Sequence, residues 1–252
     1  GKTVGIVGES GSGKSVTSFS ILKLVEDPGV VDADHIMFDG KDLAKISEKD
    51  MSKIRGKDIS MVFQDPMTGT AATMGIEENL ALAKRRGKSR SLKTGITKKE
   101  REEYKELLKS LDLSLEERMT SKVGLLSGGQ RQALTLLMAT LKKPQLLLLD
   151  EPESALDFRL RYETMGLLRT YVAKNNAAAL VTLHDPSLAL NYCDTLLVLS
   201  DCGLLGELQP FSTPISKMEP LLSSIYGTIS LTTLSTRRGE KRLIMIKEDD
   251  AC

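Results

Sequence analysis

The sequence predicts an α/β fold, in which a core with a mainly parallel sheet carries an inserted helical lobe. Three observations predict it. Short apolar runs alternate with helical stretches, a glycine-rich segment at 8–13 separates the first strand from the first helix, and the pattern turns helical between Met67 and about Leu141. Strands covered by helices on both faces have continuous apolar runs, so this alternation favours a parallel sheet.

The first part of the core is expected to hold three strands and two helices. Val4–Val7, His35–Phe38 and Ile59–Phe63 have the short apolar runs of buried strands. A helix is expected to follow the glycine-rich segment as far as about Val25, and a polar helix to cover Ser47–Arg55.

The inserted region is expected to be a lobe of helices. Ile76–Arg86 has a helical pattern, and Thr97–Glu100 is a capping box for a second helix. Ser114–Glu117 resembles a weaker capping box. A third long helix is expected over Gly129–Leu141, before the basic and proline-containing stop at 142–144.

Strand patterns return after this lobe. Strands are expected at Gln145–Leu149, Ala178–Leu183 and Thr195–Ser200, with helices near Leu156–Asn175 and Ser187–Cys193 between them. A small helix and a β-hairpin are expected from about residue 209 onward. The predicted organisation is a core of 1–66 and 142–208, a helical lobe of 67–141 and an appendage of 209–252.

Composition excludes several classes of protein. The 252 residues are 40% hydrophobic and 27% charged with a net charge of +1, and no apolar run approaches the about twenty residues of a bilayer-spanning helix. Three cysteines and two histidines predict neither a disulfide framework nor a zinc site, and favour a reducing, cytoplasmic setting. Nine Lys and Arg residues lie in Lys84–Arg101, but no aromatics are interleaved, so no nucleic-acid partner is expected.

The glycine-rich segment has the pattern of a phosphate-binding loop, and it lies between a strand and a helix as that loop requires. Its glycines let backbone N–H groups surround phosphate oxygens, and the helix start adds the positive end of its dipole. Lys14 is expected to reach the terminal phosphates and the Ser15 hydroxyl to hold Mg²⁺. The residues expected to contact the triphosphate are Gly8, Glu9, Ser10, Gly11, Ser12, Gly13, Lys14 and Ser15.

Two carboxylates end the apolar strand near residue 149. Ligands bind at the carboxyl ends of strands in open α/β sheets, so Asp150 and Glu151 are expected beside the phosphate loop. Asp150 is a candidate ligand of the Mg²⁺ shell. Glu151 is the candidate that orients the attacking water or accepts its proton.

A second glycine-rich helix start lies twenty residues before Asp150. It comprises Leu126, Ser127, Gly128, Gly129 and Gln130. Exposed N–H groups and a hydroxyl make it a second candidate anion site, although it has no lysine. Two such sites could hold one triphosphate from both sides if two copies pack head to tail.

These motifs, in this order, resemble the ATP-binding-cassette (ABC) ATPase family over essentially the whole chain. The resemblance implies a RecA-like P-loop core and implies roles for three further residues. Gln64 resembles the glutamine that contacts Mg²⁺ and the attacking water, and His184 the histidine that contacts the γ-phosphate. Asp157, in the segment 154–157, resembles the loop that crosses to the partner subunit.

The resemblance also implies a setting. Two ATPase subunits, identical or related, bind ATP and Mg²⁺, and act on the cytoplasmic face of the membrane with permease subunits on separate chains. Residues 1–66 resemble oligopeptide-importer ATPases, residues 67–150 amino-acid-importer ATPases, and the end of the chain iron-chelate and cobalamin-importer ATPases. All three favour import, and they differ in cargo.

One departure from the family is expected to matter. The family begins with two more strands, one of which carries an aromatic ring that stacks on adenine, whereas seven residues precede the phosphate loop here. We expect these N-terminal strands to be missing and adenine binding to be weaker by about 1–3 kcal/mol. Two alternatives stay open: a soluble ABC ATPase of DNA repair or translation, and a truncated or chimeric cassette that folds without turning over ATP.

Overall fold

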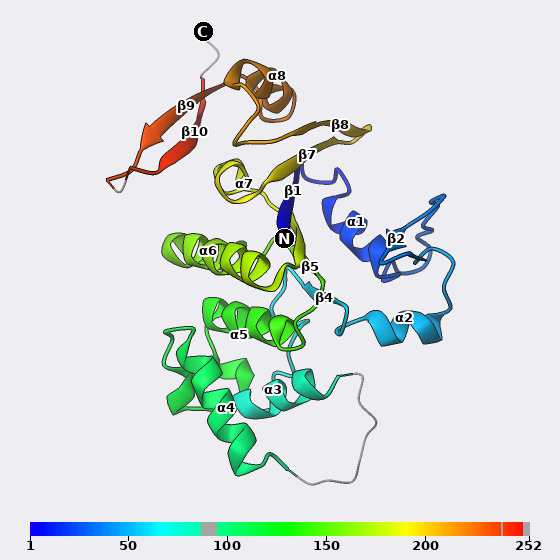
Figure 1. The fold of residues 1–252 in the computed structure, drawn as a ribbon, viewed down its shortest axis with the longest axis vertical. Helices are drawn as coiled ribbons and strands as arrows, with labels where there is room; N and C mark the ends of the chain where they lie inside the picture. The colour runs from blue at the N-terminus through cyan, green and yellow to red at the C-terminus, as the bar shows by residue number, and fades with distance from the viewer. Residues whose placement is uncertain (87–94, 238, 249–252) are drawn as a thin grey trace. The chain divides into compact units, whose positions relative to one another are not determined.

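The computed structural model describes residues 1–86, 95–237 and 239–248 (Figure 1). The chain divides into two compact units, one formed by residues 1–32 with 165–252 and the other by residues 33–164. The long helix α6 (Phe158–Asn175) runs from the second unit into the first.

The sheet of the first unit has the strand order β6-β1-β7-β8. Its strands are β1 (Lys2–Gly8), β6 (Ala178–Thr182), β7 (Thr195–Ser200) and β8 (Gly203–Leu208). β1 pairs in parallel with both β6 and β7, and β8 is antiparallel to β7. The apolar runs at β1, β6 and β7 therefore form the parallel sheet that the sequence predicts.

In the described part of the first unit, three helices accompany the end of α6. They are α1 (Lys14–Ile21), α7 (Pro186–Tyr192) and α8 (Ile215–Tyr226). The predicted helix to about Val25 is too long, because α1 ends at Ile21 and Lys23 takes a left-handed backbone conformation with φ 51°. A helix cannot continue through a left-handed residue.

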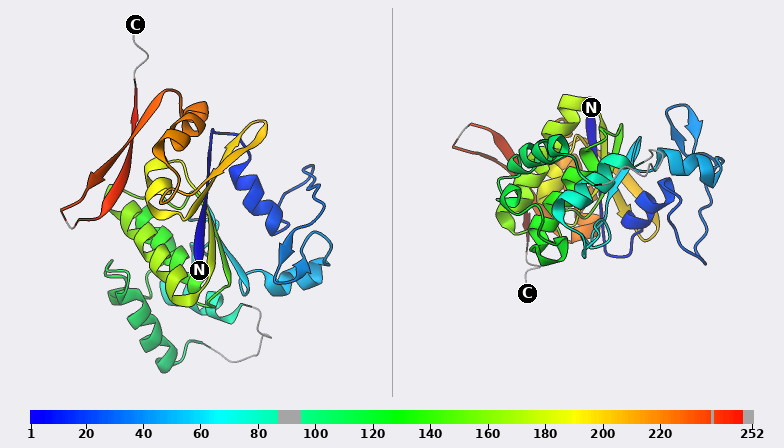
Figure 2. Two further views of the ribbon diagram at one scale, coloured as in Figure 1. Left: turned by 45° about the horizontal axis from the view of Figure 1, so that its top comes forward. Right: turned by 90° about the horizontal axis from the view of Figure 1, so that it is seen from below.

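The C-terminal part of the first unit is a small helix followed by a hairpin, as expected. The strands β9 (Ile229–Ser235) and β10 (Lys241–Lys247) pair antiparallel, with Leu243 opposite Thr233. The hairpin contacts α7 through β10 and α8 through β9, and the left view of Figure 2 shows it beside them. Buried Ile229 and Leu231 fix its inner face.

The second unit has a parallel pair of strands, β4 (Ile59–Val62) and β5 (Leu146–Asp150). A two-residue pairing of β2 (Met37–Phe38) with β3 (Lys41–Asp42) precedes them, so the strand predicted from His35 is shorter than expected. The predicted polar helix is α2 (Glu48–Ile54), and Ser47 caps its start by accepting a hydrogen bond from the Asp50 N–H.

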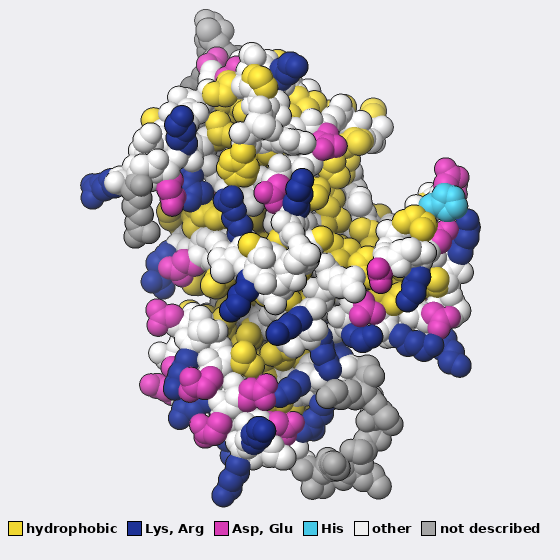
Figure 3. Space-filling model, in the orientation of Figure 1, with side chains coloured by type: hydrophobic (Ala, Val, Ile, Leu, Met, Phe, Trp, Pro, Cys, Tyr) yellow, Lys and Arg dark blue, Asp and Glu magenta, His cyan; other side chains and the backbone are white. Residues whose placement is uncertain are grey.

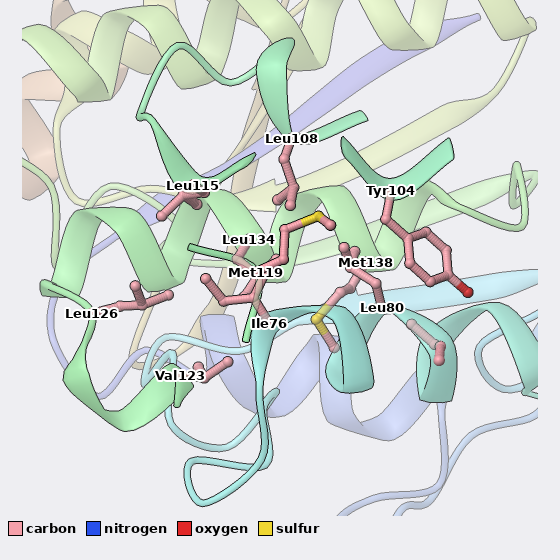
Figure 4. Close-up of a cluster of buried hydrophobic side chains, with 12 residues drawn as sticks. Ile76, Leu80, Tyr104, Leu108, Leu115, Met119, Val123, Leu126, Leu134 and Met138 are labelled. Atoms are coloured by element: carbon pink, nitrogen blue, oxygen red, sulfur yellow. The ribbon is translucent and has the colours of Figure 1, made fainter. Parts of the chain in front are cut away.

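The rest of the second unit is the helical lobe. Its helices are α3 (Ile76–Arg85), α4 (Lys98–Lys109) and α5 (Gly128–Thr140), with 3-10 turns η1 (Leu115–Glu117) and η2 (Val123–Leu125). Figure 4 shows that all five contribute to one apolar core. Its labelled members are Ile76, Leu80, Tyr104, Leu108, Leu115, Met119, Val123, Leu126, Leu134 and Met138.

One capping box of the lobe is confirmed and the other is wrong. Thr97 and Glu100 exchange the two hydrogen bonds of a capping box at α4. Ser114 makes no side-chain cap, because its φ of 53° is left-handed and the turn that follows is a three-residue 3-10 helix.

The surface of the lobe carries charges of both signs. Figure 3 shows Lys and Arg side chains interspersed with Asp and Glu over it. Within the basic stretch Lys84–Arg101, Lys84 pairs with Glu103, Arg85 with Glu100 and Arg101 with Glu77. Residues 87–94 of that stretch lie outside the described residues.

Among the helices in the described part of the chain, none combines the length and apolar character that a bilayer span requires.

Candidate nucleotide site

The loop after β1 is built around glycines that no other residue can replace without strain. A Cβ atom on Gly8 would lie 2.3 Å from the Leu199 carbonyl oxygen of the adjacent strand β7. Gly11 and Gly13 both have φ 87°, in the left-handed region that only glycine adopts at little cost. Gly13 is the N-cap of α1, so the loop delivers the chain directly into a helix start with free N–H groups.

Lys14 is a buried cation in this loop. Its side chain is 4% exposed, and its ammonium group donates hydrogen bonds to the carbonyl oxygens of Gly8 at 3.0 Å and Glu9 at 2.8 Å. No carboxylate forms an ion pair with it among the residues that the structure describes. Burying a charge without a counter-charge is costly, so this position favours an anionic ligand.

His184 lies at the same edge of the sheet as the loop. Ile6 on β1 is opposite Thr182 on β6, and the Leu183 N–H donates to the Ile6 carbonyl oxygen at 3.0 Å. Gly8 and His184 each stand two residues beyond this opposed pair, at the carboxyl ends of neighbouring parallel strands. The His184 residue is exposed, so its ring can contact a ligand held by the loop.

In the second unit, neighbouring strands end in the polar residues that the sequence singled out. Val62 on β4 is opposite Leu149 on β5, so Gln64 and the carboxylates of Asp150 and Glu151 follow at one edge. The Gln64 Nε2 donates to the Glu151 Oε2 at 2.5 Å. Asp150 and Glu151 are 2% and 5% exposed.

Glu151 has a backbone conformation that a non-glycine residue takes only at a cost. Its φ is 46°, in the left-handed region, and its carbonyl oxygen accepts from the Ser154 N–H at 3.0 Å. Backbone strain of this kind costs about 1–3 kcal/mol and is concentrated at functional sites. The turn aims the Glu151 carboxylate at the Gln64 amide instead of letting it continue the alternation of β5.

The second glycine-rich helix start is an open N-terminus on α5. Ser127 and Gln130 exchange the two hydrogen bonds of a capping box, at 3.3 and 3.2 Å. Ser127 and Gly128 are exposed. The Ser127 hydroxyl oxygen accepts the capping bond, so its proton is left to donate to a ligand, beside free N–H groups at the first turn.

The helix start packs against the segment that holds Asp157. A Cβ atom on Gly129 would lie 2.9 Å from the Leu160 Cδ1, and one on Gly128 would lie 3.4 Å from the Ala155 carbonyl oxygen. The Asp157 carboxylate accepts from the Leu160 N–H at 2.9 Å and caps the start of α6. The glycines therefore allow the two helix starts to approach closely.

Two arginines support this site without a local sequence signal. Arg118 donates to the Gln130 Oε1 at 2.9 Å, which adds positive charge beside the helix start. Arg131 donates to the carbonyl oxygens of Gly124 at 3.2 Å and Leu126 at 3.0 Å, and also contacts the Met67 sulfur. It thus joins the segment after Gln64 to the loop before Ser127.

The structure thus gathers the predicted residues into two groups, one in each unit. The first unit holds Gly8, Glu9, Ser10, Gly11, Ser12, Gly13, Lys14, Ser15 and His184, and the second holds Gln64, Leu126, Ser127, Gly128, Gly129, Gln130, Asp150, Glu151 and Asp157. The first group provides an anion-binding loop, and the second provides carboxylates at a sheet edge and a second open helix start. Nucleotide-binding α/β proteins use sites of both kinds.

Residues 1–154 match the ABC transporter family. The chain is 36% identical over 199 residues to a tyrosine transport ATP-binding protein of Clostridioides difficile, covering 79% of this chain and 76% of that protein. It is 37% identical over 209 residues to an oligopeptide transport ATP-binding protein of Bacillus subtilis, covering 79% of this chain. The chain belongs to the ABC transporter family, and carries the ATPase cassette of that family.

The fold of the chain is also similar to that of a solved ABC cassette structure. The dimeric, post-hydrolysis structure of the ATP-binding cassette MJ0796 bound to ADP and phosphate has a TM-score of 0.71 and 26% identity, covering 83% of this chain and 85% of that one. The family and fold class predicted from the sequence are confirmed. The chain spans 55% of the length of the Bacillus subtilis relative and 60% of a dipeptide transport ATP-binding protein of Escherichia coli.

Proposed function

We propose that the chain is the ATP-hydrolysing subunit of an ABC importer, which works with membrane-spanning subunits on separate chains. The setting of Lys14 carries this proposal. Its buried ammonium donates to two loop carbonyls at a helix start, and no carboxylate among the described residues pairs with it, so a phosphate chain is favoured as its partner. The ATP-binding relatives and the ADP-bound neighbour support ATP as the nucleotide.

In the first unit, the loop binds the phosphates. The N–H groups of residues 11–15 surround phosphate oxygens, and Lys14 neutralises the terminal phosphates. His184, at the same sheet edge, contacts the γ-phosphate and so distinguishes ATP from ADP. The exposure of His184 and the register of β1 with β6 support this role.

In the second unit, the carboxylates carry the chemical step. Glu151 orients the attacking water and accepts its proton, while the Gln64 amide holds the Glu151 carboxylate in position. The hydrolysis depends on positioning and electrostatics and forms no covalent intermediate with the protein.

Each unit contains oxygen donors of the kind that Mg²⁺ binds. The Gln64 side chain bonds Glu151 through its nitrogen, which leaves its amide oxygen as a donor to a cation, and the Asp150 carboxylate and Ser15 hydroxyl are the other candidates. Among the described residues, no group of three His, Cys, Asp or Glu side chains is arranged to hold a metal ion, so most ligands would come from ATP and water. When bound, the ion neutralises phosphate charge.

Two copies of the cassette close around two ATP molecules. Each ATP lies between the loop at Lys14 of one copy and the segment Leu126–Gln130 of the other, with Asp157 near the partner. The exposed capped start of α5 and the dimeric structural neighbour support this arrangement, which is a closed two-fold interface. Hydrolysis then loosens the pair, and attached membrane subunits convert the motion to transport.

The cassette acts as a peripheral subunit on the cytoplasmic face of the membrane. The relatives named for peptide and tyrosine transport support a transport role. The lobe 67–141 is proposed as the part that bears the second anion site, and the core 1–66 with 142–208 as the part that binds nucleotide. The mixed charge of the lobe surface gives no support to a nucleic-acid partner.

A phosphate-release assay with Mg·ATP tests this function. The parent chain is expected to release phosphate, and Lys14→Ala and Glu151→Gln to lose that activity, the first with weakened and the second with retained ATP binding. A parent that binds Mg·ATP but releases no phosphate would support a cassette that folds without turnover. Copurification with ribosomes or DNA instead of membrane subunits would support a soluble ABC ATPase.

A further inference from the structure

The C-terminal hairpin contacts α7 through a buried amide and through the guanidinium of Arg242, which lies 5.2 Å from the centre of the Tyr192 ring. Asn191, near the end of α7, is 7% exposed. Its Nδ2 donates to the Leu243 carbonyl oxygen at 2.8 Å, and its Oδ1 accepts from the Leu243 N–H at 3.0 Å. One amide therefore satisfies both backbone groups of a residue in β10. Figure 1 shows α7 and β10 as neighbouring elements.

These two bonds use the backbone groups of Leu243 that a neighbouring strand would otherwise pair with along the edge of β10. In an antiparallel hairpin, alternate residues direct both the N–H and the carbonyl away from the partner strand. Leu243, opposite Thr233, directs both of its groups to Asn191. The same Nδ2 also donates to the Ser187 carbonyl oxygen at 2.7 Å, one turn earlier in α7. Asn191 thus closes the edge of β10 and joins it to the helix.

The other end of α7, which begins at Pro186, lies next to His184 in the chain. Asp185 is the N-cap of α7 and accepts from the N–H groups of Ser187 at 2.8 Å and Leu188 at 3.3 Å. His184 is the residue before this cap. Because α7 has only seven residues and is fixed by buried apolar side chains, its placement sets the direction in which the chain leaves residue 184.

α8 packs against β9 and against the strands β7 and β8. Burial raises the pKa of the Tyr226 hydroxyl to about 12, and the negative charge of Asp185 adds to the shift. Glu219 of α8 accepts from the Leu231 N–H at 2.7 Å and so ties that helix to β9. The hairpin therefore contacts α7 at Asn191, and α8 is tied to the hairpin through Glu219.

We propose that Asn191 is a positioning residue for ATP hydrolysis: by anchoring α7 to β10 it fixes His184 toward the γ-phosphate. The segment α8–β9–β10 then contributes to the rate of ATP hydrolysis by holding α7 in place, and is not a packing appendage. This inference rests on the proposed function of His184, and adds to it a structural element outside the core motifs.

A matched pair of variants separates positioning from plain stability. Asn191→Ala removes the bonds to β10 and the bond to Ser187. Asn175→Ala, in α6, removes a bond from the Asn175 Nδ2 to the Tyr171 carbonyl oxygen at 2.9 Å, which has the same four-residue spacing but reaches no strand. We expect Asn191→Ala to lower kcat at least about tenfold with KM for Mg·ATP within about twofold, and Asn175→Ala to change neither.

A double-mutant cycle identifies the residue through which Asn191 acts. In a His184→Ala background, Asn191→Ala is expected to change kcat by less than about twofold, because the group that it positions is gone. Full additivity of the two losses in kcat would overturn the inference. So would a folded Asn191→Ala protein with the parental kcat. If Asn191→Ala does not fold, Asn191→Asp keeps the acceptor for the Leu243 N–H and places a carboxylate against two carbonyls, and the same loss of kcat is expected.

Amide hydrogen exchange gives a readout besides activity. Residues 184–190 are expected to exchange faster in Asn191→Ala than in the parent, and at the parental rate in Asn175→Ala. Unchanged exchange in all three proteins would contradict the anchoring role. An inactive parent overturns the proposed function together with this inference, whereas an active parent with an unaffected Asn191→Ala overturns the inference alone.

Discussion

Replacing Glu151 with glutamine removes one charge and keeps the side chain's shape. The Gln64 amide donates to the Glu151 carboxylate at 2.5 Å. A hydrogen bond to a charged group contributes about 1.5–3 kcal/mol and one between neutral groups about 0.5–1.5 kcal/mol, so we expect the free energy of unfolding to fall by only about 1 kcal/mol. Loss of the general base is expected to reduce turnover about 10²–10⁴-fold, equivalent to about 2.7–5.4 kcal/mol in the activation free energy.

The assay is phosphate release under single-turnover conditions, together with a titration of Mg·ATP binding. The matched control is Glu207→Gln, the same change at an exposed carboxylate on β8, which is expected to leave turnover at the parental rate. If Glu151→Gln hydrolysed ATP within about twofold of the parent, Glu151 would not be the base. If it lost ATP binding as well, the carboxylate would have a structural and not a chemical role.

Three further predictions concern other parts of the molecule. Lys14→Ala is expected to weaken Mg·ATP binding about 10–100-fold in a calorimetric titration, and undiminished affinity would remove the phosphate-loop assignment. Gly8→Ala places a Cβ within 2.3 Å of the Leu199 carbonyl oxygen and is expected to lower the free energy of unfolding, measured with denaturant, by about 3 kcal/mol. Gly166→Ala in α6 places its Cβ where no atom lies within 4 Å and is expected to raise that free energy by about 0.5–1 kcal/mol. Equal effects of the two substitutions would refute the packing argument. Burial raises the pKa of the Tyr104 hydroxyl from 10.0 to about 12, so the folded state holds this proton more tightly than the unfolded state does. The stability that this difference contributes is present below pH 10.0 and is lost as the pH rises through about 12. Tyr104→Phe is therefore expected to lose less stability between pH 10.0 and about 12, and identical pH profiles of thermal unfolding for the two proteins would contradict this reasoning.

The elements with a strong local pattern were predictable. The apolar runs at β1, β5 and β7 and the capping box at Thr97 each carry their own signal, because side-chain burial and capping act over a few residues. The box at Ser114 failed because a left-handed backbone overrides the capping preference. β8 was not predicted as a separate strand, because its short segment at 203–208 is mostly exposed and takes its register from β7.

The candidate site was predictable where motifs carry it and not where tertiary contacts do. The phosphate loop and the start of α5 have fixed spacings of glycine that follow from backbone geometry. Arg118, Arg131 and Asn191 take their roles from partners 12 to 64 residues away, such as Gln130, Met67 and Leu243. A single sequence holds no local pattern for such pairs.

The most direct test of the two-copy ATP site is the nucleotide dependence of self-association. Sedimentation of Glu151→Gln with saturating Mg·ATP is expected to show a dimer, and the same protein with Mg·ADP a monomer. Ser127→Arg in the same background should remove the dimer while leaving ATP bound to the loop at Lys14. A protein that binds Mg·ATP and stays monomeric at concentrations well above its ATP dissociation constant would contradict the account.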